Sequence, residues 1–165
     1  MSSFSIANTL TLRNFYNGNR NYAVKASRSD ISTDKLSYAD SVALRRAVKK
    51  LGSYDFKNAG EDDIEEMVRG FIDTYNNTLD SSRYSTNRSV QSAYKGFKKL
   101  AETYADDLED IGIKVDSSGY LKFSSSAKTN IKGSRFQEKL GSGSDFMKQL
   151  STYAKRISSH IDITL

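Results

Sequence analysis

Three short segments contain residue types that could bind a phosphate or a cation. Residues 141–144 read Gly-Ser-Gly-Ser before a predicted helix, and backbone amides there could cradle a phosphate, but the lysine and the preceding strand of a phosphate-binding loop are absent. Residues 61–66 hold several carboxylates without EF-hand spacing, and residues 116–119 read Asp-Ser-Ser-Gly without the later ligands of a calcium loop. We therefore interpret the three segments as a linker with an N-cap, a solvated helix N-terminus and a plain turn.

The side chains of most catalytic sites are scarce in this chain. It has no cysteine, which excludes thiol catalysis and Cys-ligated zinc. Its one histidine, His160, argues against a His-based metal site or a Ser-His-Asp triad. We therefore expect no enzymatic activity, no cofactor and no metal ion.

Length and charge set further limits on the class of protein. The 165 residues fit one domain, and the net charge of +5 is unevenly placed, with an acidic middle at residues 61–116 between two basic ends. A nucleic-acid-binding protein usually gathers its basic residues on one face, so this partner is less favoured. No apolar run approaches the roughly 20 residues of a membrane span, and residues 1–13 lack the pattern of a cleavable signal peptide. The sequence predicts a protein that is soluble or is exported without such a signal.

The apolar periodicity predicts a mainly α protein. Stripes with spacings of three and four indicate helices at about residues 32–51 and 61–81, and the second carries Phe71 and Tyr75 on its apolar face. The strongest pattern predicts one helix over residues 87–111, where seven residues follow an unbroken 3.5-residue repeat, as in a coiled-coil seam. The residues of this seam are Val90, Tyr94, Phe97, Ala101, Tyr104, Leu108 and Ile111.

The short link at residues 82–86 indicates how the second and third helices are arranged. It favours an antiparallel helical hairpin or a small bundle. The aromatic stripe of the seam is then most simply an ordinary core. The alternative is that part of the stripe docks a partner helix or another copy of the chain.

The hydrophobic period changes from 3.5 to 2 beyond residue 112. Alternating apolar residues on either side of a turn predict a small β-hairpin at about residues 113–123. An isolated hairpin is marginally stable in water, so we expect its apolar face to cap one end of the helices.

The remaining segments are assigned from composition and spacing. Residues 124–143 are polar with a few apolar anchors, and Ser142 or Ser144 can N-cap a last helix. Residues 1–30 are predicted to form an irregular or weakly β arm, which leaves residues 31–165 as the helical domain. The apolar face of the last helix consists of Phe146, Leu150, Tyr153 and Ile157.

Three motifs, taken in order, resemble a known family. Residues 71–79 read Phe-Ile-Asp-Thr-Tyr-Asn-Asn-Thr-Leu, residues 108–113 read Leu-Glu-Asp-Ile-Gly-Ile, and residues 116–121 read Asp-Ser-Ser-Gly-Tyr-Leu. Together they resemble the C-terminal region of flagellar hook-associated protein 2, the filament cap family. In that family an F-V-D-x-Y-N-x-L helix is followed by a long helix, then by L-x-x-I-G-I and D-x-x-G-x-L. The resemblance covers roughly residues 61–159.

The resemblance implies a structural role in the bacterial flagellum. It implies self-association, or packing with flagellin-like or other axial subunits, outside the cell after export without a cleavable signal peptide. Under this interpretation the seam and the face of the last helix supply the helix-packing contacts. Two alternatives stay open: a helical export chaperone or adaptor that remains in the cytoplasm, and, less favoured, a basic nucleic-acid-binding module.

Overall fold

The computed structural model describes Arg28, residues 31–124 and residues 131–161, so the predicted arm at residues 1–30 lies almost wholly outside the described residues. Within the described part the chain is mainly α with one small antiparallel β-hairpin, which confirms the predicted fold class. The elements are α3 (Thr33–Gly52), α4 (Glu61–Arg83), α5 (Arg88–Thr103), α6 (Ala105–Glu109), β1 (Ile113–Val115), β2 (Leu121–Phe123), α7 (Gly133–Leu140) and α8 (Asp145–His160).

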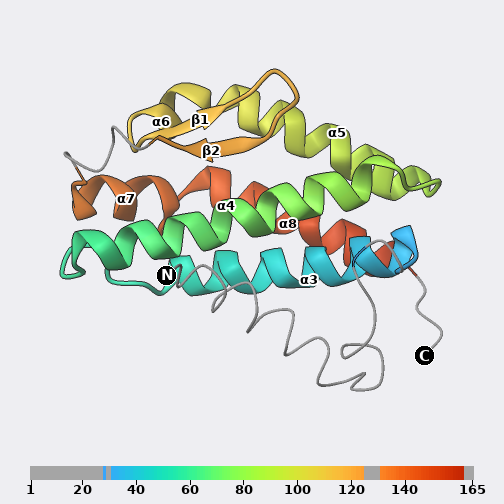
Figure 1. Cartoon of the computed structure of the whole chain (residues 1–165), viewed down its shortest axis with the longest axis horizontal. Helices are drawn as coiled ribbons and strands as arrows, with labels where there is room; N and C mark the ends of the chain where they lie inside the picture. Colours follow the sequence, from blue (N-terminus) through green and yellow to red (C-terminus); the bar gives the residue numbers. More distant parts are fainter. Residues whose placement is uncertain (1–27, 29–30, 125–130, 162–165) are drawn as a thin grey trace.

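The four longest helices form a small closed bundle (Figure 1). Helix α3 packs against α4 and α8, and α5 also packs against α4 and α8, so each of the four contacts two others. The seam helix therefore has two partners and not only the preceding helix. Phe97 shows this arrangement, because its ring lies 5.9 Å from that of Tyr75 on α4 and 5.9 Å from that of Tyr153 on α8.

Side-chain caps explain where two of the helices begin. The Asn87 side chain accepts hydrogen bonds from the backbone N–H groups of Ser89 and Val90 at the start of α5. Ser144, one of the two serines that the sequence offered as the cap, accepts one from the N–H of Met147 at the start of α8. Each cap satisfies donors that the first helical turn leaves without partners.

The predicted helix over residues 87–111 is interrupted at Tyr104, which corrects the sequence prediction. The backbone of Tyr104 has φ −104° and ψ 17°, so α5 ends there and the short α6 begins at the next residue. The N–H of Tyr104 still bonds to the carbonyl of Leu100, and the N–H of Leu108 bonds to that of Tyr104. Because these bonds keep the helical register, the apolar repeat continues through the break and could not reveal it.

Helix α7 lies in the segment that the sequence pattern left without a regular element. Phe136 and Leu140 are buried one helical turn apart, and they are the only strongly apolar anchors of this element. The helix begins at Gly133, where an added Cβ would collide with the backbone carbonyl of Phe56. Two anchors are too few to establish a helical period, which explains why the pattern did not predict α7.

The β-hairpin confirms the predicted strands but not their predicted placement. β1 and β2 pair antiparallel, with Ile113 opposite Phe123 and Val115 opposite Leu121. In the connecting turn Gly119 adopts φ 86°, a conformation that favours glycine. The hairpin lies lengthwise along α4 and does not cap an end of the bundle (Figure 1). Ile113, Leu121 and Phe123 of the hairpin are buried in the core, and polar bonds to α4, described below, add to this contact. Apolar periodicity does not encode the polar bonds.

The crossing of α3 and α4 is built from small polar side chains. Ser37 donates a hydrogen bond to the backbone carbonyl of Ser81 at 2.7 Å. The Thr78 hydroxyl shares its proton between the backbone carbonyls of Asp40 at 3.0 Å and Thr74 at 2.8 Å. These groups are buried, so the bonds remove polar atoms from water without leaving them unpaired. Helices with small side chains at the contact can lie close together.

A close approach of α5 and α8 makes Gly96 sensitive to substitution. A Cβ added there would lie 2.6 Å from Cζ and 2.8 Å from Cδ1 of Tyr153. We expect Gly96→Ala to destabilise the fold by about 1–3 kcal/mol through overpacking, although alanine gains about 1 kcal/mol over glycine in helix propensity. Chemical denaturation of the variant and the parent protein measures this difference.

A double variant separates the effect of the collision with Tyr153 from the effect of the higher helix propensity of alanine. In a Tyr153→Ala background the ring is absent, so Gly96→Ala should stabilise the protein. An increase in stability for Gly96→Ala in the parent protein would contradict the close contact.

Candidate functional site

The hairpin is fastened to α4 by two neighbouring side chains, which we call the helix–hairpin joint. The Tyr75 hydroxyl lies 3.0 Å from the carbonyl oxygen of Gly119 and 3.3 Å from that of Phe97, and both contacts are buried. Asn76 donates from Nδ2 to the carbonyl of Leu121 at 2.8 Å and accepts from its N–H at 2.9 Å. The Asn76 amide thus pairs with the outer edge of β2 as a neighbouring strand would.

Removing the Asn76 amide should loosen the hairpin. Asn76→Ala leaves the N–H and C=O of Leu121 without partners in a half-buried setting, so we expect a loss of about 1–3 kcal/mol in the free energy of unfolding. Faster hydrogen exchange at the Leu121 amide should accompany this loss.

The adjacent Asn77 provides the matched control, since no hydrogen bond of its side chain is found within the described residues. Asn77→Ala should leave both the stability and the exchange of Leu121 close to those of the parent protein. Equal effects of the two substitutions would contradict the specific role of Asn76.

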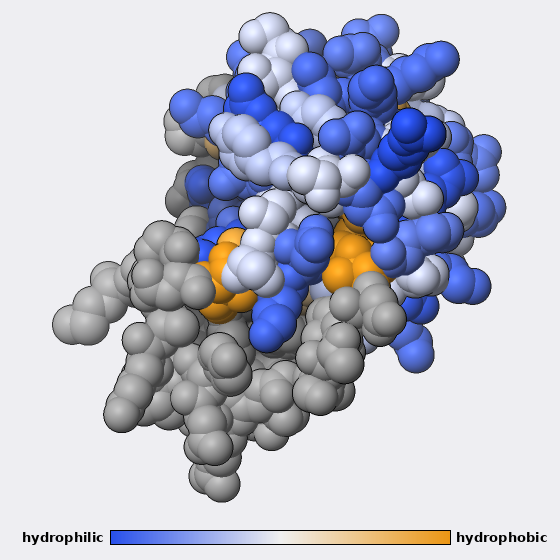
Figure 2. All heavy atoms as spheres, turned by 90° about the vertical axis from the view of Figure 1, so that its right-hand side faces the viewer, coloured by the Kyte–Doolittle hydropathy of each residue, from blue (hydrophilic) through white to orange (hydrophobic). Residues whose placement is uncertain are grey.

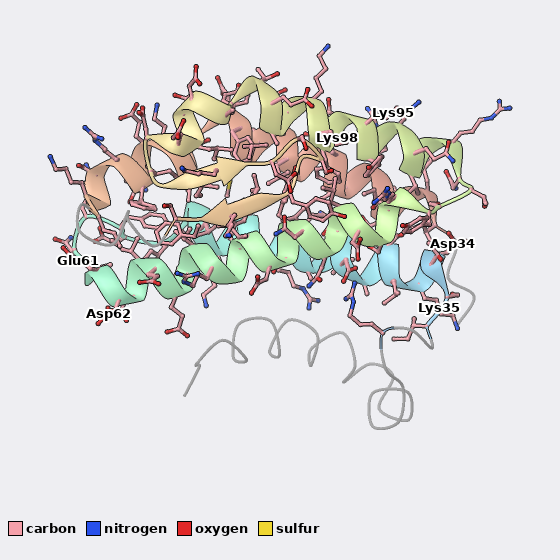
Figure 3. All side chains as sticks on the ribbon, turned by 45° about the horizontal axis from the view of Figure 1, so that its top comes forward. Asp34, Lys35, Glu61, Asp62, Lys95 and Lys98 are labelled. Carbon is pink, nitrogen blue, oxygen red and sulfur yellow. The ribbon has the colours of Figure 1, made fainter. Side chains whose placement is uncertain are left out.

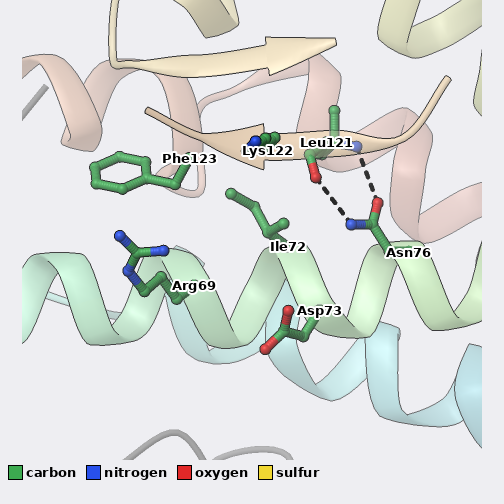
Figure 4. Close-up of a pocket in the computed structure, with 7 residues that line it drawn as sticks. All are labelled: Arg69, Ile72, Asp73, Asn76, Leu121, Lys122 and Phe123. Atoms are coloured by element: carbon green, nitrogen blue, oxygen red, sulfur yellow. Dashed lines mark hydrogen bonds between the residues drawn. The ribbon is translucent and has the colours of Figure 1, made fainter. Parts of the chain in front are cut away.

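An open pocket of about 250 Å³ lies beside the joint, between α4 and β2 (Figure 4). The guanidinium of Arg69 sits 5.3 Å from the centre of the Phe123 ring, and its Nε donates to Glu65 at 2.7 Å. Such a lining offers charge, hydrogen-bonding groups and an aromatic face for contact with another molecule. The lining residues are Arg69, Ile72, Asp73, Asn76, Leu121, Lys122 and Phe123.

Burial raises the pKa of the Asp73 carboxyl, and the nearby Arg69 opposes this shift more weakly. Because the folded-state pKa exceeds the unfolded one, ionisation of Asp73 disfavours the folded state as pH rises through the folded-state pKa. Asp73→Asn should therefore raise the melting temperature slightly at pH 7 and leave it unchanged near pH 3. Thermal melts of both proteins at the two pH values measure this, and a lower melting temperature for Asp73→Asn at pH 7 would contradict it.

Burial also raises the pKa of the Tyr75 phenol, with the charge of Asp116 as the next largest cause. The phenol therefore stays protonated at neutral pH and remains a hydrogen-bond donor to the carbonyls that it contacts. Its role in the joint does not depend on pH in the physiological range.

The structure places most of the thirteen residues predicted as seam or interface inside the core. Ten of them are buried: Phe71, Tyr75, Val90, Phe97, Ala101, Leu108, Ile111, Phe146, Leu150 and Ile157. Tyr94, Tyr104 and Tyr153 are half-buried and pack against this core. The structure thus brings the seam together with Phe71 and Tyr75 of α4 and with the apolar face of α8. Among the described residues, only the three tyrosines of this set retain a partly exposed surface.

Two of the three half-buried tyrosines, Tyr104 and Tyr153, have specific partners in the same chain. The Tyr104 ring lies 5.6 Å from that of Phe146, and its hydroxyl accepts a hydrogen bond from Gln149 at 3.2 Å. The guanidinium of Arg156 lies 5.7 Å from the centre of the Tyr153 ring. The seam therefore leaves little apolar surface exposed on which a partner helix or another copy of the chain could dock.

Two polar features were absent from the predicted site residues. The first is the pairing of Asn76 with β2. Asn76 lies in the motif at residues 71–79, but its position follows no hydrophobic period. The second is the bidentate pair between Arg28 and Asp40, with N···O distances of 3.0 and 2.8 Å. The partners of such pairs lie on different segments, so only the structure reveals them.

Two of the three segments with ion-binding residue types lie in different elements. Residues 61–66 begin α4, and residues 116–119 form the hairpin turn, in which Asp116 accepts hydrogen bonds from backbone N–H groups of Ser118 and Tyr120. No cluster of histidine and carboxylate side chains suited to a metal ion occurs among the residues that the structure describes.

No helix in the same part of the chain has the length and apolar character needed to cross a membrane. Comparisons of the chain with protein-family models, curated proteins and solved structures find no match.

Proposed function

We propose that this chain is a structural subunit of a flagellar axial or cap-like assembly, which acts by packing with copies of itself or with flagellin-like subunits. The observation that carries the proposal is the helix–hairpin joint. Two of the motifs on which the resemblance rests, residues 71–79 and 116–121, meet there through Tyr75 and Asn76. Motifs that are distant in sequence but bonded in space form one structural unit. This supports the proposal that the chain shares its architecture with the family that it resembles.

The surface of the molecule supports contact through polar groups. Figure 2 shows the end at which α3 begins and α4 ends, where hydrophilic side chains predominate among the described residues and hydrophobic ones form small separate areas. Tyr84 is the one large hydrophobic side chain that is strongly exposed in the described part, at 68%. A subunit of this kind would associate through charged and hydrogen-bonding surfaces, with its apolar seam kept for its own fold.

Fractionation of the native cells tests the proposal. Extracellular filaments are sheared from the cells and compared with the cytosol by quantitative mass spectrometry. We expect enrichment of this chain in the filament fraction, in parallel with flagellin.

A strain that lacks flagellar export is the control, because the chain should then accumulate inside the cell. Retention in the cytosol of actively flagellated cells would contradict the proposal and would favour an export chaperone or adaptor. Equal extracellular amounts with and without flagellar export would also contradict it.

A further inference from the structure

One exposed face of the α5–α6 segment separates its charges by sign. Six exposed residues step along it by seven, four, three, four and four positions, which keeps them on one side of a helix. The hydrogen bonds through Tyr104 preserve the helical register between the two elements. We call this face the charged ridge; its members are Arg88, Lys95, Lys99, Glu102, Asp106 and Asp110.

The α5 part of the charged ridge opposes the helix dipole, whereas Asp106 lies in the first turn of α6, where an acidic residue is favourable. Cations at the N-terminal end of a helix and anions at its C-terminal end are both unfavourable. Helices α3, α4 and α8 have acidic residues in the first turn and basic residues in the last. Helix α5 has neither, and instead begins with Arg88 and carries Glu102 near its end. The stability of α5 therefore does not account for the order of charges from Arg88 to Glu102.

Ion pairing within the chain does not account for it either. Within the described residues, the close ion pairs between side chains involve none of the six ridge residues. Figure 3 shows the α5 side chains Lys95 and Lys98 at the margin of the bundle, far from Glu61 and Asp62 at the start of α4. In the described part of the chain, the ridge thus presents a basic half and an acidic half that have no opposite charge within bonding distance.

We propose that a second copy of this chain binds the charged ridge in antiparallel orientation, about a twofold axis between Lys99 and Glu102. This inference rests on the self-association in the proposed function and names its surface. The basic and acidic halves are mirrored in spacing, because Lys95 and Lys99 are four residues apart, as are Glu102 and Asp106. An antiparallel copy would set Lys99 opposite the partner's Glu102 and Lys95 opposite the partner's Asp106, and the twofold axis would repeat both pairs.

Complementary charge favours this orientation over a parallel one. In a parallel pair Lys95 would face the partner's Lys95, and like charges in register are repulsive. Because exposed ion pairs are screened by salt, the complex should be strong at low ionic strength and weak at high ionic strength.

Sedimentation of the full chain at low and high salt is the first test. We expect a dimer in 50 mM NaCl and a Kd that is weaker by at least about tenfold in 500 mM NaCl, because salt screens the pairs. A monomer at low salt overturns the inference, and so does a dimer that is insensitive to salt.

Complementary charge reversal identifies the surface. The variants Lys95→Glu/Lys99→Glu and Glu102→Lys/Asp106→Lys should each be folded by circular dichroism and monomeric, because the four residues that face the partner then carry one sign. Mixed together they should form a heterodimer, since an acidic ridge meets a basic one. Failure of the folded variants to pair overturns the inference.

The matched control changes charge by the same amount elsewhere. Lys49→Glu/Lys50→Glu alters two exposed lysines of α3 and should leave the dimer intact. Loss of the dimer in this variant would mean that net charge governs association, and would overturn the assignment to the ridge. These results are independent of the cell fractionation, so a monomer found in the filaments would reject the ridge dimer and not the axial role.

Discussion

Replacing Phe97 with alanine should lower the free energy of unfolding by about 3–5 kcal/mol, one of the largest effects expected for a single substitution in this chain. Phe97 is 1% exposed and lies at the centre of the bundle. Its ring meets that of Tyr75 edge to face at 83° and that of Tyr153 at a tilt of 58°, so removing it leaves a cavity between three helices.

The loss should appear as a fall in melting temperature of roughly 10 °C, given the usual relation between stability and melting temperature at this chain length. Tyr84→Ala is the control, because that ring is 68% exposed. It should change stability by no more than about 0.5 kcal/mol. An unchanged melting temperature for Phe97→Ala would mean that the seam does not form the core of the folded protein.

The spacing of apolar residues predicted the fold class because the residues that it assigns to helix faces are the ones that the bundle buries. Phe97, Leu108, Leu150 and Ile157 were assigned to seam and face by spacing alone, and all are buried. The hairpin could also be predicted from the sequence, since the hydrophobic period changes at residue 113 and Gly119 marks the turn.

The features that the pattern missed depend on contacts between distant segments. Tyr104 ends α5 without a proline or a glycine, through a modest change in backbone angles that leaves the apolar repeat intact. The Asn76 amide contributes to the placement of the hairpin along α4, and its partner lies 45 residues away in the sequence. Polar pairing of this kind has no periodicity, so a single sequence does not predict it.

The polar crossing of α3 and α4 shows the same limit. Ser37 and Thr78 sit at positions where a pattern of apolar residues would expect larger side chains. They are buried because each bonds to a carbonyl of the facing helix, and this keeps the two helices in one register.

The pair between Arg28 and Asp40 should be the second substitution site with a large effect. The Asp40 side chain is 2% exposed and that of Arg28 is 38% exposed. Arg28→Ala removes the guanidinium and leaves a buried carboxylate without its bidentate partner, so we expect a loss of about 1.5–3 kcal/mol, less than for a fully buried pair because the Arg28 side chain is 38% exposed. Denaturant unfolding of the full chain measures this loss.

The double variant Arg28→Ala/Asp40→Asn tests whether the uncompensated charge is the cause. An amide in place of the carboxylate carries no charge to bury, so the double variant should recover most of the stability that Arg28→Ala loses. The exposed pair between Lys148 and Asp145 provides the comparison, since both side chains are more than half exposed and Lys148→Ala should cost less than about 1 kcal/mol. If Arg28→Ala costs no more than Lys148→Ala, the Arg28–Asp40 pair does not hold this side of α3 in the folded protein. If the double variant recovers nothing, the loss comes from packing of the Arg28 side chain and not from the buried charge.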